Sequence, residues 1–359
     1  MISLSRGLGG VQSSFISYCK YAQKHSKFKH LVFSLHDKNK IYGEIKNFYN
    51  IKKNFISFLK YLFSKNSIIY FHNMLGNKKV LFLIKIFPSN NIIFHEHGGA
   101  WNIKTKKQIK IYQTNAQSAK KIIVNSIATK QMLIKKFRIP QDKLDLVYYG
   151  FKDPNIKKYH KNKKNFKVGI LARLESIKGV HNFIEAANLL KIKNINFLIG
   201  GDGNLEGYLK QLANQNSNIF FLGNVSRSYS FLKKLDILVV PSIREPLGIV
   251  SIEAGLCKLP VIASNIDGIP EVIINGHSGI LITPTNKISL KKYSEQPPIP
   301  DYVVQPSTYK LIKPKELNAK ILAKKILLLI KNKKLRLIYG SNLYKNVKKN
   351  SQLRIILKV

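Results

Sequence analysis

Short apolar runs alternate with segments of helical period along most of the first half of the chain. The apolar residues Val11, Phe15, Cys19 and Ala22 recur at a spacing typical of one helix face. A second helical segment covers residues 51–62, and the apolar runs lie at residues 2–5, 31–35, 91–97, 121–126 and 146–150. Because strands that alternate with helices indicate βαβ units, this pattern predicts an α/β domain with a parallel sheet.

The same pattern restarts after a stretch rich in Lys and Asn at residues 151–165. Apolar runs follow at residues 166–171, 197–203, 219–223, 237–241 and 261–264, and helical periods at 181–190, 314–332 and 334–349. A chain of 359 residues is long enough for two domains. We therefore expect an N-terminal domain over residues 1–150, a linker over 151–165 and a C-terminal domain over 166–330.

One region breaks the second pattern. Residues 291–313 contain Pro297, Pro298 and Pro300 and predict neither a helix nor a regular strand. We expect an irregular insertion there. The remaining residues, 331–359, should form a C-terminal helix that packs back on the N-terminal domain.

The charge of the chain is extreme, with 61 Lys and Arg against 18 Asp and Glu, a net charge of +43. A polyanionic partner would fit it, and so would a compositional bias toward Lys, Asn and Ile. The basic residues are dispersed and no nucleic-acid-binding module is recognisable, so we do not expect nucleic acid as a partner. The helix at residues 51–62 carries several lysines. We expect its apolar face to pack against its own sheet, and its lysine rim can contact an anionic membrane.

Other features of the sequence point to the cytoplasm. Cys19 and Cys257 fall in different predicted domains and form neither a metal-binding spacing nor a disulfide framework. No apolar run approaches the ~20 residues needed to span a bilayer, and we see no secretory signal. We expect a cytoplasmic protein that can lie on the inner face of the cell membrane.

The stretch from Asp236 to Ala254 predicts a strand, a short loop and a helix. Glu245 lies in the loop and Glu253 in the first turns of the helix. Unpaired amides at such a helix start favour a phosphate, here on Gly248, Ile249 and Val250. The two carboxylates would repel that phosphate and should bind hydroxyl groups instead. Phosphate and hydroxyls together indicate a nucleotide attached to a sugar.

The sequence of this stretch, E-P-L-G-I-V-S-I-E-A, resembles the E-x7-E motif of the retaining glycosyltransferases of family 4. Pro260-Val-Ile-Ala-Ser and Gly268-Ile-Pro-Glu-Val follow it in the order typical of that family. The resemblance extends, with gaps, from about Ser3 to Lys345 and is most specific to bacterial members that build lipid-linked and cell-envelope glycans. It implies the GT-B fold, two Rossmann-like domains facing across a cleft.

The resemblance also assigns roles in donor binding. Arg173 and Lys178 match the family's Arg-x4-Lys signature and should bind the diphosphate of a UDP- or GDP-linked sugar, with no metal and no further cofactor. Glu253 should accept hydrogen bonds from the ribose. Glu245 should act beside the transferred sugar. Val225 and Arg227 should lie against the base.

In the N-terminal half, the resemblance implies a loop that faces phosphate or acceptor, formed by Gly9, Gly10 and Gln12. It also implies that His97, more than His95, orients the sugar or acceptor. Where the family usually has Asn-Gly, this chain has Tyr149-Gly150, a substitution to which we assign no catalytic role. The implied reaction moves a hexose-type sugar with retention to a glycan or lipid-linked acceptor, and the departing phosphate takes the acceptor's proton.

Three other functions remain open from the sequence. One is a degenerate, non-catalytic protein of the same fold, favoured by the irregular stretch at residues 291–313 and the unusual ends of the chain. Another is a basic nucleic-acid-binding protein. The third is a sugar-nucleotide epimerase on the same fold, which the sequence E-P-L-G-I-V-S-I-E does not support. Donor turnover would indicate the glycosyltransferase, and donor binding without turnover would indicate the non-catalytic protein. Salt-sensitive DNA binding would indicate the nucleic-acid-binding protein. The donor sugar, its nucleotide, the acceptor and the oligomeric state cannot be predicted.

Overall fold

The computed structural model describes residues 10–34, 37–38, 42–86, 91–151, 153–154, 165–190, 192–288 and 299–350. The chain divides into two compact units, and the described residues of the first end near Phe151 whereas those of the second begin at Asp153. The predicted strand at residues 2–5, residue Gly9 and most of the predicted linker lie outside the described residues.

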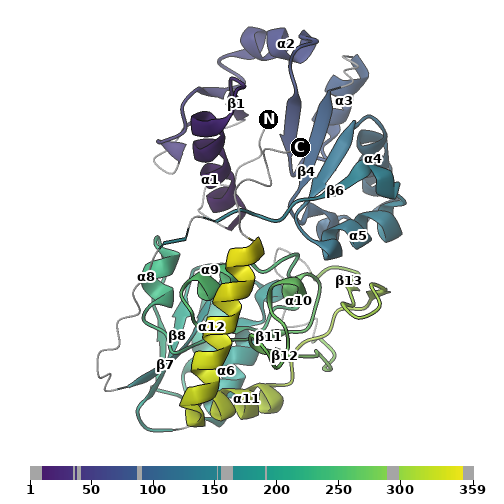
Figure 1. Cartoon of the computed structure of the whole chain (residues 1–359). Coiled ribbons are helices and arrows are strands. Elements are labelled where there is room, and N and C mark those ends of the chain that lie inside the picture. The colour runs from purple at the N-terminus through teal and green to yellow at the C-terminus, as the bar shows by residue number, and fades with distance from the viewer. Residues whose placement is uncertain are drawn as a thin grey trace. The chain divides into compact units, whose positions relative to one another are not determined.

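The first unit holds two parallel sheet segments flanked by helices (Figure 1). A two-stranded segment pairs β1 (Val32–Ser34) with β2 (Phe48–Asn50). A four-stranded segment has the order β3-β4-β5-β6, with bounds Ile69–His72, Ile92–Glu96, Lys121–Val124 and Leu144–Leu146. The helices are α1 (Gly10–His25), α2 (Phe55–Phe63), α3 (Lys78–Ile86), α4 (Lys106–Gln117) and α5 (Ile127–Phe137).

The second unit is built on six parallel strands in the order β12-β11-β10-β7-β8-β9. They span β7 (Phe166–Leu171), β8 (Ile195–Gly200), β9 (Ile219–Phe221), β10 (Ile237–Val240), β11 (Val261–Ser264) and β12 (Ile280–Ile282). Read from the opposite edge, this is the doubly wound order 3-2-1-4-5-6. The chain reverses direction across the sheet between β7 and β10, so the loops after these two strands flank the topological switch point.

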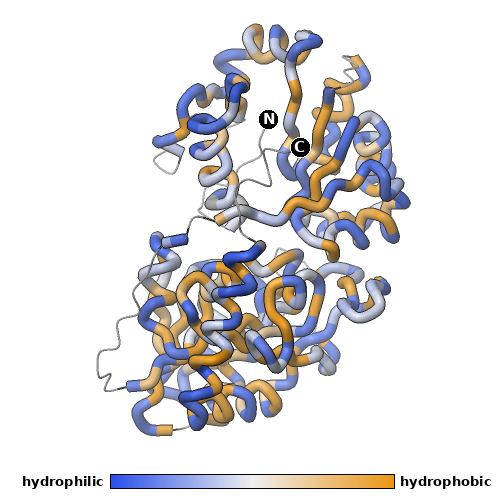
Figure 2. Tube along the Cα trace, in the orientation of Figure 1, coloured by the Kyte–Doolittle hydropathy of each residue, from blue (hydrophilic) through white to orange (hydrophobic). Residues whose placement is uncertain are grey.

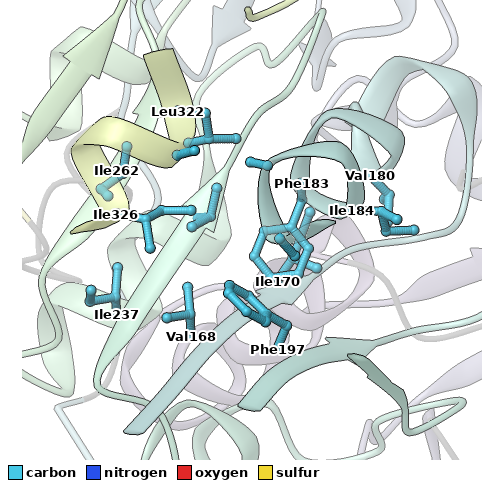
Figure 3. Packing of buried hydrophobic residues seen from close by; sticks show 14 of the residues in the cluster. Val168, Ile170, Val180, Phe183, Ile184, Phe197, Ile237, Ile262, Leu322 and Ile326 are labelled. Atoms are coloured by element: carbon cyan, nitrogen blue, oxygen red, sulfur yellow. The ribbon is translucent and has the colours of Figure 1, made fainter. Parts of the chain in front are cut away.

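Helices of the second unit cover this sheet. They are α6 (Val180–Leu189), α7 (Glu206–Ala213), α8 (Ser228–Leu232), α9 (Ile249–Leu256), α10 (Ile269–Val272), α11 (Ala319–Lys331) and α12 (Lys333–Asn350). Helices α6 and α11 pack together, and their apolar side chains meet those of the strands in one core. In this core the rings of Phe183 of α6 and Phe197 of β8 pack edge to face. Leu322 and Ile326 of α11 point into the same core (Figure 3).

Burial explains the hydropathy pattern of the strands. In Figure 2 the strands of each unit are largely orange, and β10 and β11 are buried at every position. Strands covered on both faces read as continuous apolar runs, as parallel strands of α/β proteins do. The prediction of parallel α/β sheets is therefore confirmed.

The described C-terminal helices pack within the second unit. Helix α12 packs along α9 and also contacts α10 and α11, all in the second unit. The expected return of the last helix to the first unit stays a prediction. The described part of the irregular stretch forms a short antiparallel hairpin of β13 (Val303–Val304) and β14 (Leu311–Ile312).

Candidate functional site

The loops at the switch point of the second unit place two predicted site residues in direct contact. Lys178 ends the short 3₁₀ helix Ser176–Lys178 that follows β7, and Glu245 lies in the loop that follows β10. The Lys178 Nζ lies 2.7 Å from Glu245 Oε2, and the two side chains are only 19% and 12% exposed. Ligands of open α/β sheets bind at this position, beyond the carboxyl ends of the strands at the switch point.

Close backbone packing holds the two loops together. The amide of Ile243 donates to the carbonyl of Ile177 at 2.9 Å. Gly179 has a φ of +64°, and a Cβ at this position would lie 2.0 Å from the carbonyl oxygen of Pro241. Only glycine fits there, so Gly179 keeps the Lys178 loop against the end of β10.

A helix begins where the sequence analysis expects a phosphate to bind. Helix α9 begins at Ile249, and Gly248 precedes it in the left-handed conformation with φ +91°. Ile249 and Val250 occupy the first turn and are partly exposed. The amides at this end carry the positive pole of the helix dipole, which favours an anion.

Glu253 lies one turn further along α9. Its Oε1 accepts a hydrogen bond of 2.8 Å from the Ser228 hydroxyl of α8. Burial raises the pKa of Glu253, and the Ser228 hydrogen bond opposes that shift. Val225 and Arg227 precede α8, Val225 partly buried and Arg227 exposed, so the Glu253 carboxylate and the predicted base contacts lie in neighbouring segments.

Arg173 pairs with a different carboxylate from Lys178. Its side chain is 63% exposed, and its Nη1 lies 2.5 Å from Glu175 Oε1. The structure therefore brings Lys178 and Glu245 together but pairs Arg173 with a carboxylate that the sequence did not single out.

Asp267 is a buried residue that the sequence analysis missed. Its Oδ2 accepts from the Glu245 amide at 2.9 Å, and its Oδ1 accepts from the Val304 amide at 2.7 Å. The hairpin inside the irregular stretch is thus tied through Asp267 to the loop that carries Glu245. The motif-like segment Asn265-Ile-Asp-Gly-Ile-Pro was a signal for it, but its partner at Val304 lies 37 residues away in the chain.

In the first unit, three buried histidines gather at the carboxyl edge of the four-stranded sheet segment. His72 ends β3, His95 pairs with it in register on β4, and His97 follows β4. Sequence analysis missed His72, because its strand 69–72 was not predicted and nothing links it to His97 in the chain. Gly10 begins α1 and is exposed, Gln12 is partly buried, and Phe15 of the same helix lies edge to ring against His72 at 4.9 Å.

Both ring nitrogens of His97 are engaged within the protein. Its Nδ1 lies 2.5 Å from the Tyr149 hydroxyl, and its Nε2 lies 3.2 Å from His72 Nδ1. Burial lowers the pKa of all three histidines, that of His95 to about 3, so the rings are neutral at physiological pH. The expectation that His97 itself orients the sugar or acceptor stays a prediction, and the structure adds His72 and Tyr149 to that group.

The three histidines also meet the count and distance for a metal ion, since one nitrogen from each lies within 4.8 Å of the others. The rings of His72 and His97 are nearly coplanar, 9° apart, with centroids 5.5 Å apart. Their nitrogens therefore face each other along one line, whereas metal ligands converge on a common point. This arrangement suits a shared hydrogen bond better than an ion.

Glu96 supports the turn that carries His97. Its buried carboxylate accepts from the amides of Gly98 and Ala100 and from the Tyr112 hydroxyl, at 2.9, 3.2 and 2.6 Å. Burial raises the pKa of Glu96, and these hydrogen bonds oppose that shift. These hydrogen bonds hold the Gly98-Gly99 turn after β4 in place.

Solved structures of similar proteins show the fold class of this chain. The chain has the GT-B fold, two Rossmann-like domains. It resembles a glycosyltransferase of Rickettsia africae with a TM-score of 0.72 at 20% identity, over 98% of this chain and 93% of that one. It resembles the Anabaena protein HepE, crystallised with UDP and glucose, with a TM-score of 0.77 at 18% identity, over 99% and 96%.

A family match falls largely in the second unit. Residues 151–297 match the family of glycosyl transferases group 1. A capsular polysaccharide biosynthesis glycosyltransferase of Staphylococcus aureus is 29% identical over 48% of this chain and 45% of its own length. An uncharacterized glycosyltransferase of Methanocaldococcus jannaschii is 29% identical over 54% of each. These alignments span about half the length of the curated relatives.

Proposed function

We propose that this protein is a retaining glycosyltransferase that moves a hexose-type sugar from a nucleotide-diphosphate donor to a cell-envelope glycan or lipid-linked acceptor. The observation that carries the proposal is the Lys178–Glu245 pair at the switch point, beside the start of α9. A cation, a helix start and a carboxylate are the groups that a diphosphate and a sugar hydroxyl require.

The roles divide among the residues of the second unit. Lys178 and the exposed Arg173 neutralise charge that develops on the departing diphosphate, in place of a metal ion. The amides of Gly248, Ile249 and Val250 receive a phosphate. Arriving phosphate competes with Glu245 for the Lys178 ammonium, which frees the Glu245 carboxylate for the sugar.

Glu253 binds the ribose in this proposal, with Val225 and Arg227 beside the base. Binding UDP is favoured over GDP, since the similar Anabaena protein was crystallised with UDP. The relation to a capsular polysaccharide glycosyltransferase favours a cell-envelope acceptor.

The proposal includes peripheral contact with an anionic membrane. In the part of the chain that the structure describes, no helix combines the length and apolar character needed to cross a membrane. Helix α2 buries Phe58 and Leu62 but leaves Phe55, Ile56 and Phe63 50%, 85% and 59% exposed. Lys60 lies exposed on this helix, with Lys52, Lys53 and Lys65 exposed close by in the sequence. Apolar side chains rimmed by lysines suit an interface with anionic lipid.

A panel of UDP- and GDP-sugars, incubated with the full chain and a bacterial lipid extract, tests the function through released nucleotide. Glu253→Ala and Lys178→Ala should abolish release. Glu206→Ala and Lys210→Ala, which remove a partly exposed ion pair on α7 of the same unit, should not. Donor binding without release from any donor would favour the non-catalytic alternative.

A further inference from the structure

A line of hydrogen bonds runs along the carboxyl edge of the four-stranded sheet segment in the first unit. Each of its four strands supplies one member: His72 ends β3, His97 follows β4, Asn125 follows β5 and Tyr149 follows β6. Asn125 Nδ2 lies 3.1 Å from the Tyr149 oxygen, which lies 2.5 Å from His97 Nδ1, and His97 Nε2 lies 3.2 Å from His72 Nδ1. All four residues are buried.

The direction of every proton in this line follows from its first member. Ser126 Oγ accepts from the Thr129 amide at 2.9 Å, so its own proton goes to Thr129 Oγ1 at 2.8 Å, and the Thr129 hydroxyl then donates to Asn125 Oδ1 at 2.7 Å. The amide therefore presents its NH₂ group to Tyr149. The Tyr149 oxygen then accepts from Asn125. Among the described residues its only other partner is His97 Nδ1, so the phenol donates its single proton there.

The two histidines continue the same direction. His97 accepts at Nδ1, and a neutral imidazole that accepts at one nitrogen carries its proton on the other. Its Nε2–H therefore donates to His72 Nδ1. By the same argument His72 carries its proton on Nε2, and that nitrogen makes no hydrogen bond to any residue that the structure describes.

We infer that Tyr149, oriented by Asn125, is a positioning residue that sets the tautomers of His97 and His72, so that His72 presents an N–H donor to a ligand oxygen. The ligand is the sugar or acceptor of the proposed function, on which this part of the inference rests. Tyr149 follows β6, so a hydroxyl from the fourth strand orients the histidines of the first two strands.

Replacement of Asn125 by Asp offers a sharp test, since the two side chains have the same shape. An aspartate in that place can only accept, so Tyr149 would donate to it and accept from His97 Nδ1. Both histidines would then carry their protons on Nδ1, and His72 Nε2 would become an acceptor. Tyr149→Phe removes the hydroxyl and should release His97 to a mixture of tautomers.

The tautomers can be read directly by NMR of full-length protein with ¹⁵N-labelled histidine, without donor or acceptor. We expect Nε2–H for His72 and His97 in the wild type, Nδ1–H for both in Asn125→Asp, and a mixture for His97 in Tyr149→Phe. Tyr42→Phe, at another buried tyrosine of the same unit, is the matched control and should leave both unchanged. The chemical-shift dispersion of the backbone amides of the first unit reports whether each variant is folded.

Wild-type protein with Nδ1–H on His97, or a folded Tyr149→Phe variant with wild-type tautomers, would overturn the inference whatever the protein's activity. Turnover then tests the link to the ligand. Tyr149→Phe should lower kcat about tenfold, the scale of one hydrogen bond to the reacting groups, with the donor KM little changed. Reversed tautomers in Asn125→Asp with unaltered turnover would show that His72 does not contact the ligand.

Discussion

Lys178 and Glu245 are 67 residues apart in the chain, and their side chains form a 2.7 Å ion pair where the sheet of the second unit reverses direction. Glu245 Oε2 also accepts from the Ser242 hydroxyl at 3.3 Å. The pair joins the loops after β7 and β10, so it serves the architecture of the site as well as the proposed chemistry.

Removing one partner of this pair should cost more stability than removing both. Lys178→Met leaves a largely buried Glu245 carboxylate without its cation, which should lower the free energy of unfolding by about 1–3 kcal/mol. The double variant Lys178→Met/Glu245→Gln should recover part of that loss. Urea unfolding of the wild type, Lys178→Met, Glu245→Gln and the double variant measures the coupling free energy of the two side chains. Strictly additive effects on the free energy of unfolding would contradict a direct interaction.

Asp267 should control donor affinity without touching the donor. In Asp267→Asn one carboxylate oxygen becomes an NH₂ group that faces a backbone amide, either that of Glu245 or that of Val304. We expect a loss of about 1–3 kcal/mol in stability and weaker binding of the nucleotide sugar, measured by calorimetry. Asp236→Asn is the control, at a carboxylate that accepts from the backbone amide of Lys167 at 2.9 Å. It should lower stability but leave donor affinity intact.

The stability of the protein should depend on the protonation of Glu253. Burial raises its pKa in the folded state, so the folded protein binds more protons than the unfolded chain as the pH rises from the unfolded value of about 4.3 through the raised one. Glu253 therefore destabilises the fold increasingly over that window and fully above it. Glu253→Gln should leave Tm unchanged below the window and raise it above. An equal difference in Tm at all pH values would contradict this.

Transfer should not require a divalent cation, because Lys178, Arg173 and the start of α9 supply positive charge for the diphosphate. We expect nucleotide release to persist in excess EDTA after dialysis against the chelator. Restoration by Mg²⁺ or Mn²⁺ of an activity lost on dialysis would assign the charge compensation to a metal.

Membrane contact through α2 should depend on its exposed apolar residues. Ile56→Asp should weaken sedimentation with vesicles of phosphatidylglycerol and phosphatidylcholine about tenfold, the scale of burying one isoleucine. Ile321→Asp on α11, also an exposed isoleucine, should have no effect. Equal binding to vesicles of phosphatidylcholine alone would show that the lysines do not contribute to membrane binding.

The sequence by itself determined most of the α/β architecture and the motif residues of the second unit. The continuous apolar strands at 166–171, 237–241 and 261–264 and the spacing of Glu245 and Glu253 are local signals, because a buried parallel strand and a helix start each depend on neighbouring residues. The strands at 48–50 and 69–72 escaped prediction because they are short and only partly buried.

Only the tertiary structure decided which side chains meet. Pairing of β3 with β4 places His72 beside His95 and His97, and the order of β5 and β6 brings Asn125 and Tyr149 to the same edge. Asp267 likewise joins Glu245 to Val304 across an apparently irregular stretch. Such contacts depend on strand order and register, which bring distant segments together and leave no periodic trace in the sequence.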